Sequence, residues 1–299
     1  MSPRHTRIDA TAATLMVVLC AIWGLNQVAA KVVNAGISPL LQAGLRSAGA
    51  ALLLWAWSSA RGVRLFERDG SLPAGLLAGL CFAMEFALIY WGLEFTTASR
   101  AIVFLYTAPF WVAIGVHVLV PGEHLQRNQV AGLITAFAGV VIAFSDGLTF
   151  PSWSQVLGDV MLLGAGLLWG ATTVVVKASR LATVTANKTL LYQLGVSGVL
   201  LPMASLLLGE AGIFAATPFI WATLAFQTVI VAFITYLAWF WLVAHYPAGR
   251  LSSFTFLTPL FGLVAGGVLL NEPITVALVV AMILVGAGIW LVNRSMPKP

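Results

Sequence analysis

The chain has 299 residues, of which 60% are hydrophobic and only 8% are charged. An ordinary soluble domain is about 45–50% apolar and about 25% charged. The composition therefore excludes a soluble enzyme, a disordered chain and a secreted disulfide-stabilised domain, and it predicts an integral membrane protein. Cys20 and Cys81 both lie in apolar runs, where we expect them to act as small hydrophobic residues.

Ten mostly apolar stretches follow one another along the chain, each about 20 residues long, which is the length of a membrane-spanning helix. They do not alternate between apolar and polar residues as barrel strands do. We therefore expect an all-α integral membrane protein with ten transmembrane helices and no soluble domain. The predicted spans are residues 11–33, 38–60, 72–94, 98–119, 128–145, 155–178, 187–209, 217–244, 249–271 and 273–293.

The lysines and arginines are distributed unevenly between the two sides of the predicted bundle. With the N-terminus in the cytoplasm, twelve lie on the cytoplasmic side, Lys31 and Arg100 lie opposite, and Arg46 lies within the second span. By the positive-inside rule both termini are then cytoplasmic, and we expect the inner membrane of a bacterium. The net charge of +5 reflects this topology and an affinity for anionic lipid, and it is no sign of nucleic-acid binding.

Several features of the first half recur in the second half, in the same order, after 146–150 residues. The pairs are Trp23 and Trp169, Lys31 and Lys177, Arg100 and Arg250, Pro109 and Pro259, and Glu123 and Glu272. Each half holds five spans, an odd number, so the second half must enter the bilayer from the opposite side. We expect two inverted-topology repeats, residues 1–146 and 147–299, which are typical of secondary transporters. A duplication retained only for packing is the alternative.

The first span also has features of a signal peptide, because Arg4 and Arg7 precede an apolar run and Val28-Ala29-Ala30 resembles a cleavage site. Its counterpart in the second half favours a retained helix.

Trp23-Gly24 with Asn26 nearby, Arg46, and Ala98-Ser99-Arg100 followed by Pro109 resemble the drug/metabolite transporter superfamily. The two halves are similar to its paired EamA domains, and the resemblance covers nearly the whole chain. Within that superfamily the chain is similar to the YddG-like exporters of aromatic amino acids. The resemblance implies a central cavity lined by the first, third, fourth, sixth, eighth and ninth spans.

Polar groups at mid-membrane depth are costly and mark functional sites. Glu85 lies near the middle of the third span, as a candidate proton carrier or contact for a substrate ammonium group; a structural carboxyl is the alternative. Thr235, its repeat counterpart, is also polar, so we expect both positions to face a cavity. Arg46 is expected about 12 Å deep in its span. It has either a structural role, which the resemblance favours, or a role in binding a substrate carboxylate.

Asn26 lies one turn beyond Trp23, and Thr172 stands in the same relation to Trp169. An aromatic ring beside a hydrogen-bonding group suits a small amphipathic solute, whereas hydrogen bonding between helices is the alternative. The tyrosines at mid-span, Tyr106 and Tyr236, would add aromatic lining for an apolar or aromatic ligand; core packing is the alternative.

Pro109 and Pro259 occupy equivalent places inside the fourth and ninth spans. An interior proline removes a backbone hydrogen bond and bends a helix. The pair is therefore a candidate hinge of a transport cycle, with static kinks as the alternative.

Enzyme function is not expected. Gly195-Val196-Ser197-Gly198 and the His124 to Asn128 spacing resemble motifs of intramembrane serine proteases. Ser197, however, is expected about 13 Å deep and His124 in a surface loop. No metal-ligand cluster or phosphate-binding loop is present in the sequence, so we expect no cofactor. A channel is a further alternative, but rings of like charge are not visible.

The sequence thus predicts a monomeric carrier, embedded in the lipid bilayer, that exports small molecules by alternating access. The expected substrates are amino acids, with aromatic and large apolar ones favoured. Only Glu85 and Arg46 are expected to be deep ionisable residues, which disfavours strongly charged substrates. Efflux of hydrophobic neutral or cationic compounds is the alternative function.

Overall fold

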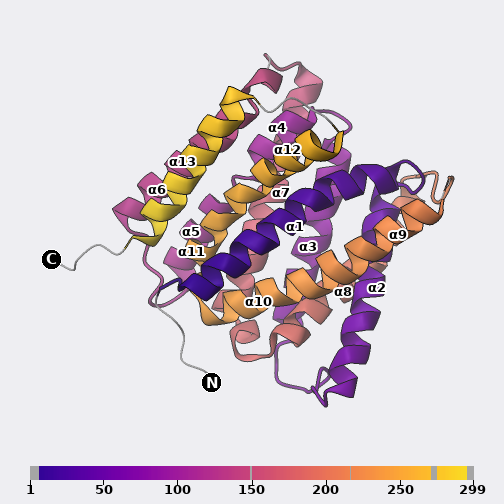
Figure 1. The fold of residues 1–299 in the computed structure, drawn as a ribbon. Helices are drawn as coiled ribbons and strands as arrows, with labels where there is room; N and C mark the ends of the chain where they lie inside the picture. Colours follow the sequence, from indigo (N-terminus) through magenta and orange to yellow (C-terminus); the bar gives the residue numbers. More distant parts are fainter. Residues whose placement is uncertain (1–6, 149, 216, 271–274, 295–299) are drawn as a thin grey trace.

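The computed structural model describes residues 7–148, 150–215, 217–270 and 275–294, which form a bundle of helices (Figure 1). Arg4, Glu272 and Lys298 lie outside the described residues. No β-strand occurs in the described part of the chain, where the only strand-like pairing is an isolated bridge between Ile37 and Ile213. The all-α fold class is confirmed.

Every apolar stretch of the sequence coincides with one helix or with consecutive helices. The α-helices are α1 (Ala10–Asn34), α2 (Pro39–Ala60), α3 (Leu72–Gly92), α4 (Ala98–Leu105), α5 (Ala108–Leu119), α6 (Arg127–Ala143), α7 (Trp153–Ala178), α8 (Ala186–Leu207), α9 (Pro218–Phe226), α10 (Tyr236–His245), α11 (Ala248–Ser253), α12 (Leu257–Leu270) and α13 (Val276–Asn293). Side-chain caps set several starts, since Asp9, Thr185, Thr217 and Thr275 each accept a hydrogen bond from a backbone N–H of the first turn.

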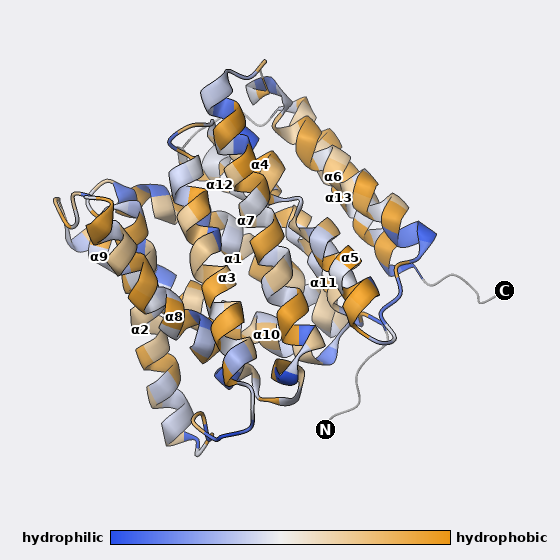
Figure 2. Ribbon diagram, turned by 180° about the vertical axis from the view of Figure 1, so that it is seen from behind, coloured by the Kyte–Doolittle hydropathy of each residue, from blue (hydrophilic) through white to orange (hydrophobic). Residues whose placement is uncertain are grey.

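Eight helical segments in the described residues are long and apolar enough to cross a membrane. The helix α6 is a shorter apolar helix, and α2, which carries Gln42 and Arg46, is not among the eight. The count of ten spans therefore stays a prediction. Hydrophobic residues predominate along the helices (Figure 2). Many large apolar side chains are exposed on the outside of the bundle, for example Leu207, which is 84% exposed. Such a surface is stable in lipid and not in water.

Two of the segments are interrupted at equivalent places. The helix α4 ends at Leu105 and α5 begins at Ala108, so Pro109 lies in the first turn of α5. In the second half, a 3-10 turn (Phe254–Phe256) separates α11 from α12, and Pro259 is the third residue of α12. The expectation that Pro109 sits inside a continuous helix is wrong: the chain is already broken at Tyr106 and Thr107, and proline is well tolerated where a helix begins.

A third irregularity was not expected. Between α9 and α10 the chain forms a π-helix from Gln227 to Thr235. Wide turns of this kind are rare and concentrate at functional sites. Pro202 lies inside α8 and is therefore an interior proline, unlike Pro109, which lies in the first turn of α5.

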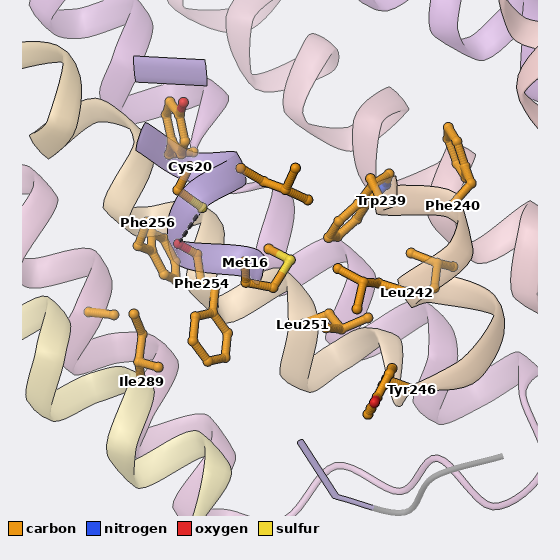
Figure 3. Packing of buried hydrophobic residues seen from close by; sticks show 14 of the residues in the cluster. Met16, Cys20, Trp239, Phe240, Leu242, Tyr246, Leu251, Phe254, Phe256 and Ile289 are labelled. Atoms are coloured by element: carbon orange, nitrogen blue, oxygen red, sulfur yellow. Dashed lines mark hydrogen bonds between the residues drawn. The ribbon is translucent and has the colours of Figure 1, made fainter. Parts of the chain in front are cut away.

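Helices from the two halves form one core (Figure 3). Met16 and Cys20 of α1 lie beside Phe254 and Phe256, and the Cys20 thiol donates to the Phe254 carbonyl oxygen at 3.2 Å. Further along α1, a Cβ added at Gly24 would lie 2.7 Å from the Gly262 nitrogen of α12. Only glycine allows that approach, so Gly24 fixes the distance between α1 and α12.

The helices α6 and α13 lie side by side at one edge of the molecule (Figure 1). Their contact is close because a Cβ at Gly132 would meet the Gly288 carbonyl oxygen at 2.6 Å. The remaining helices surround the centre of the bundle. Cys20 and Cys81 are free and buried, as the sequence predicted.

Candidate functional site

A cavity of about 520 Å³ lies at the centre of the bundle. Residues of α1, α3, α4, α7, α10 and α12 form most of its wall, which are the six spans that the family resemblance implied. The cavity extends to the end of the molecule where α1 finishes and α4 begins, at Lys31, Asn34, Ala98 and Ser99. We call this end the open end. The volume of the cavity falls in the range of small-molecule sites, about 300–1,000 Å³.

Most of the residues predicted to form a substrate pathway do line this cavity. They are Trp23, Asn26, Glu85, Tyr106, Trp169, Thr172 and Tyr236, and Pro259 also lies in the wall. They come from five different helical segments that are far apart in sequence. The cavity therefore gathers them in one place.

Thr235 departs from the expectation that it faces the cavity. It is 1% exposed and is not part of the wall; instead its hydroxyl accepts a hydrogen bond from the Trp23 indole N–H at 2.8 Å. The same hydroxyl donates to the Val231 carbonyl oxygen at 2.6 Å, within the π-helix. Thr235 thus holds Trp23 in position from behind, and its contact links the first half of the chain to the second.

The amides beside Trp23 also bond to other helical segments. Asn26 accepts from the Gln227 amide at 3.1 Å, and Gln27 donates to the Tyr106 hydroxyl at 3.5 Å. Thr172 bonds only to the Leu168 carbonyl oxygen of its own helix, at 2.9 Å. Asn26 therefore takes part in hydrogen bonding between helices, whereas Thr172 adds little cross-linking.

Aromatic rings make up much of the wall. Trp23 meets Tyr236 and Trp239 edge to face at centroid distances of 6.3 and 5.9 Å. Tyr106 meets Trp169 in the same way at 5.6 Å. Edge-to-face packing of this kind stabilises the wall.

Two buried charges lie close together on one side of the bundle: Glu85, which lines the cavity, and Arg46, which is not part of the wall and lies against the wall residues Phe86 and Tyr236. Glu85 is 7% exposed and lies on α3, and Arg46 is 3% exposed and lies on α2. The Arg46 guanidinium carbon is 4.8 Å from the centre of the Phe86 ring and 6.0 Å from that of Tyr236. No ion pair within 4.0 Å joins Arg46 to Glu85 in the described chain, and Arg46 Nε and Nη2 have no hydrogen-bond partner there. A buried guanidinium with free N–H groups is a ready partner for an anionic oxygen.

The opposite end is closed by a polar network. Lys177 Nζ lies 3.1 Å from Glu123 Oε1 and 2.7 Å from the Tyr246 carbonyl oxygen. Glu123 also accepts from the Ala248 N–H at 2.9 Å, and the Tyr246 hydroxyl donates to Asp9 at 2.8 Å. These bonds tie together α1, α5, α7 and α11. We call this end the closed end, because none of these five residues lines the central cavity.

A second cavity, of about 560 Å³, lies at the closed end between α5, α6 and α11. Glu123, Lys177, Tyr246 and Arg250 are in its wall, together with backbone of the loop before α6. Its wall contains none of the residues predicted for the substrate pathway, and it shares no wall residue with the central cavity.

Other ionisable side chains are also buried within the protein, although they lie nearer the ends of their helices than Glu85 does. Arg100 and Asp159 form a buried ion pair, in which Arg100 Nε lies 3.1 Å from both carboxylate oxygens. Lys177 and Lys188 are also buried, at 6% and 3% exposure. These additional charges are paired near the ends of helices, which is where an ion pair can form at least cost.

Lys188, at the start of α8, binds the loop between α2 and α3. Its Nζ lies 2.8 Å from Asp69 Oδ2, and the Ser71 hydroxyl donates to Asp69 Oδ1 at 2.6 Å. The Lys188 ammonium and the Ser71 bonds hold the pKa of the Asp69 carboxyl well below its usual range. Asp69 itself lies in the loop, outside the candidate membrane-spanning segments.

Several wall residues were not singled out by the sequence. They are Gln27, Thr173, Gln193, Trp239, Phe240 and Thr258. Trp239 and Phe240 follow Tyr236 by one helical turn, which is a signal that i, i+3 and i+4 spacing could have given. Gln193 lies in a helix that also carries Tyr192 and Ser197, and intramembrane depth was its only signal.

The structure gives no support to the protease motif. Ser197 is fully buried and its hydroxyl donates to the Leu194 carbonyl oxygen at 3.4 Å. His124 is exposed in the loop before α6 and lies beside the ring of His117. A nucleophilic serine needs a base within hydrogen-bond reach, and no such contact is present between Ser197 and His124. Among the described residues no group of three or more His, Cys, Asp or Glu side chains could hold a metal ion.

The fold and the cavity define an integral membrane protein with an aromatic, small-molecule-sized chamber inside a helical bundle. Comparison with known proteins identifies the family within this class. The model of the EamA-like transporter family matches residues 10–145 and again residues 156–294. The chain belongs to the EamA-like transporter family, within the drug/metabolite transporter superfamily.

The relatives are transporters. An uncharacterized transporter of Bacillus subtilis, YvbV, is 31% identical over 95% of this chain and 92% of its own length. A probable amino-acid metabolite efflux pump of Escherichia coli is 26% identical over 96% of this chain and 95% of its own length. A crystal structure of 17% sequence identity superposes with a TM-score of 0.83 over 95% of this chain and 96% of that one, which supports the fold.

Proposed function

We propose that this transporter is an exporter-type secondary carrier of amino acids, favouring aromatic and large apolar ones. The observation that carries the proposal is the central cavity, whose aromatic wall includes Glu85, with the Arg46 guanidinium directly behind the wall residue Phe86, 4.8 Å from its ring centre. The aromatic wall suits a large apolar side chain. Glu85 suits the ammonium group of an amino acid, and Arg46 suits its carboxylate.

Two further points support this assignment. The paired Trp23 and Trp169, with Tyr106 and Tyr236, present rings with polar tips, which suit an aromatic side chain. The efflux pump of Escherichia coli that resembles this chain is described as acting on amino-acid metabolites, which fits the same substrate class.

The proposed mechanism is alternating access between two inverted repeats, residues 1–146 and 147–299. In this scheme the structure corresponds to a state open at one end, since the cavity reaches Asn34 and Ser99 while Lys177 and Glu123 tie the other end together. Pro109 and Pro259 lie beside the two interrupted segments, where bending costs least. We further propose a monomer in a bacterial inner membrane, with both termini in the cytoplasm.

Efflux of hydrophobic neutral or cationic compounds is the second candidate. The observation that favours it is the single buried carboxyl, Glu85, among aromatic rings, because such a site also binds a lipophilic cation. In this case Arg46 has no role in recognition.

Counterflow in proteoliposomes separates the two. Purified protein is reconstituted with unlabelled amino acid inside, and uptake of labelled phenylalanine, tryptophan and methionine is compared with that of a labelled lipophilic cation. The proposal predicts saturable counterflow of the amino acids. Movement of the cation without any of the three amino acids would establish the second candidate, and ion conductance in place of counterflow would indicate a channel.

A further inference from the structure

Gln193 is an unpartnered polar group in the wall of the central cavity. It lies on α8, it is 0% exposed, and neither its Oε1 nor its Nε2 has a hydrogen-bond partner among the described residues. A buried amide without a hydrogen-bond partner is costly. A group of this kind in a cavity wall is explained by a ligand that pairs with it.

The place of Gln193 along the cavity follows from helix contacts. A Cβ added at Gly79 of α3 would lie 2.8 Å from the Tyr192 carbonyl oxygen and 2.7 Å from Val196 Cγ2, so α8 touches α3 on both sides of Gln193. Glu85 lies six residues beyond Gly79 on α3, or ~9 Å at 1.5 Å per residue. Because α3 runs toward the open end, Gln193 lies nearer the closed end than Glu85 does.

The part of the cavity between Glu85 and the closed end is aromatic. Trp239 and Phe240 line it and lie one turn nearer the closed end than Tyr236. A substrate whose ammonium group meets Glu85 would therefore direct its side chain toward these rings and the Gln193 amide. A separation of ~9 Å between the two levels, measured along the helix, is one that an aromatic amino acid with a hydrogen bond at each end can bridge.

The amide offers both an acceptor, Oε1, and donors on Nε2. An indole N–H can donate to Oε1, and a phenol hydroxyl can donate to Oε1 or accept from Nε2, whereas a phenyl ring can do neither. We infer that Gln193 is a specificity-determining residue that hydrogen-bonds the polar edge of the substrate's aromatic ring, so that indole and phenol side chains are favoured over phenyl. This inference rests on the proposed function.

The position of Gln193 in the repeat gives independent support. It follows Arg46 by 147 residues, within the spacing that relates the two halves. Both side chains are buried polar groups with unpartnered atoms, on the equivalent helices α2 and α8. The equivalent helices α2 and α8 thus each carry a buried side chain with unpartnered atoms, Arg46 and Gln193, and we assign that of α2 to the main chain of the substrate and that of α8 to its side chain.

The test is competition against counterflow of labelled tryptophan by unlabelled tyrosine and phenylalanine, for the wild type and Gln193→Met. Methionine keeps the length of the side chain and removes the amide. One neutral hydrogen bond corresponds to about a fivefold to tenfold change in affinity. We expect the preference for tyrosine over phenylalanine to fall by about that factor, through weaker inhibition by tyrosine and with inhibition by phenylalanine unchanged.

Ser197→Ala is the matched control, because Ser197 lies one turn further on α8, is equally buried and bonds only to its own helix. It should leave the preference unchanged. Gln193→Asn, which withdraws the amide by one carbon, is expected to shift the preference in the same direction and is used where Gln193→Met does not fold. A wild-type preference retained in a folded Gln193 variant would overturn the inference and leave the proposed function standing. A wild type that moves no tryptophan would overturn both.

Discussion

Lys177 and Glu123 form an ion pair of 3.1 Å at the closed end of the cavity, with side chains only 4% and 15% exposed. The lysine lies in the last turn of α7 and the glutamate lies in the loop after α5, so the pair joins these two segments. Lys177 adds a bond to the Tyr246 carbonyl oxygen at 2.7 Å. The closed end is therefore held by a buried charge with several partners.

Removing that charge should destabilise the protein. In Lys177→Met, Glu123 is left as a partly buried carboxylate without its cation, and breaking a buried pair from one side costs about 3 kcal/mol. Thermal unfolding of the purified protein in detergent measures the loss. Arg180→Met is the control, because Arg180 is exposed just beyond the same helix and should change stability by less than about 0.5 kcal/mol. Equal losses in both variants would show that the pair does not hold the closed end.

Pro109 and Pro259 lie in the first turns after the two interruptions of the fourth and ninth spans. If these breaks bend during transport, Pro109→Ala and Pro259→Ala should change the maximal rate of counterflow more than the half-saturating substrate concentration. Pro73→Ala, at the start of α3 and far from either break, should change neither. Unchanged turnover in both Pro109→Ala and Pro259→Ala would remove the hinge from the account.

The contact between Asp69 and Lys188 should depend on pH in a defined direction. Because the pKa of Asp69 is lowered in the folded protein, its contribution to stability is present above the unfolded pKa of about 3.9 and is lost as the pH falls. Asp69→Asn should therefore melt at a lower temperature than the wild type at neutral pH, and the difference should shrink in acid. Melting curves at several pH values measure this. A difference that stays constant with pH would mean that the carboxylate charge is not what holds the loop.

Hydropathy predicted the helical stretches well, since α1, α3 and α7 begin and end within a few residues of the expected bounds. It did not predict the break at Tyr106 and Thr107 or the π-helix before Tyr236. Apolar composition is the same in a continuous and an interrupted helix, so it contains no information about backbone breaks. Such breaks are set by tertiary contacts, among them the bond from Trp23 to Thr235.

The sequence identified only some of the residues of the candidate site, because only some of them stand out from an apolar background. Deep polar residues such as Glu85 and Asn26 stand out in an apolar sequence, because burying them in lipid is costly. Trp239 did not stand out, because the chain has 11 tryptophans and most positions suit a tryptophan in a membrane protein. The ion pair between Arg100 and Asp159 was missed because its partners are 59 residues apart, and sequence alone does not show which buried charges meet.

Protection of a cavity cysteine by substrate tests most directly whether transport uses this cavity. Ile102, in the wall of the cavity, is changed to cysteine in a background without Cys20 and Cys81, and Ser154→Cys, exposed at the start of α7, is the control. The variants are labelled with a membrane-impermeant thiol reagent, with and without tryptophan. The account predicts that tryptophan slows labelling of the Ile102 variant and not of the control, and that labelling stops counterflow only in the Ile102 variant. Labelling of the Ile102 variant that is as fast with tryptophan as without it, in protein that still transports tryptophan, would contradict the account.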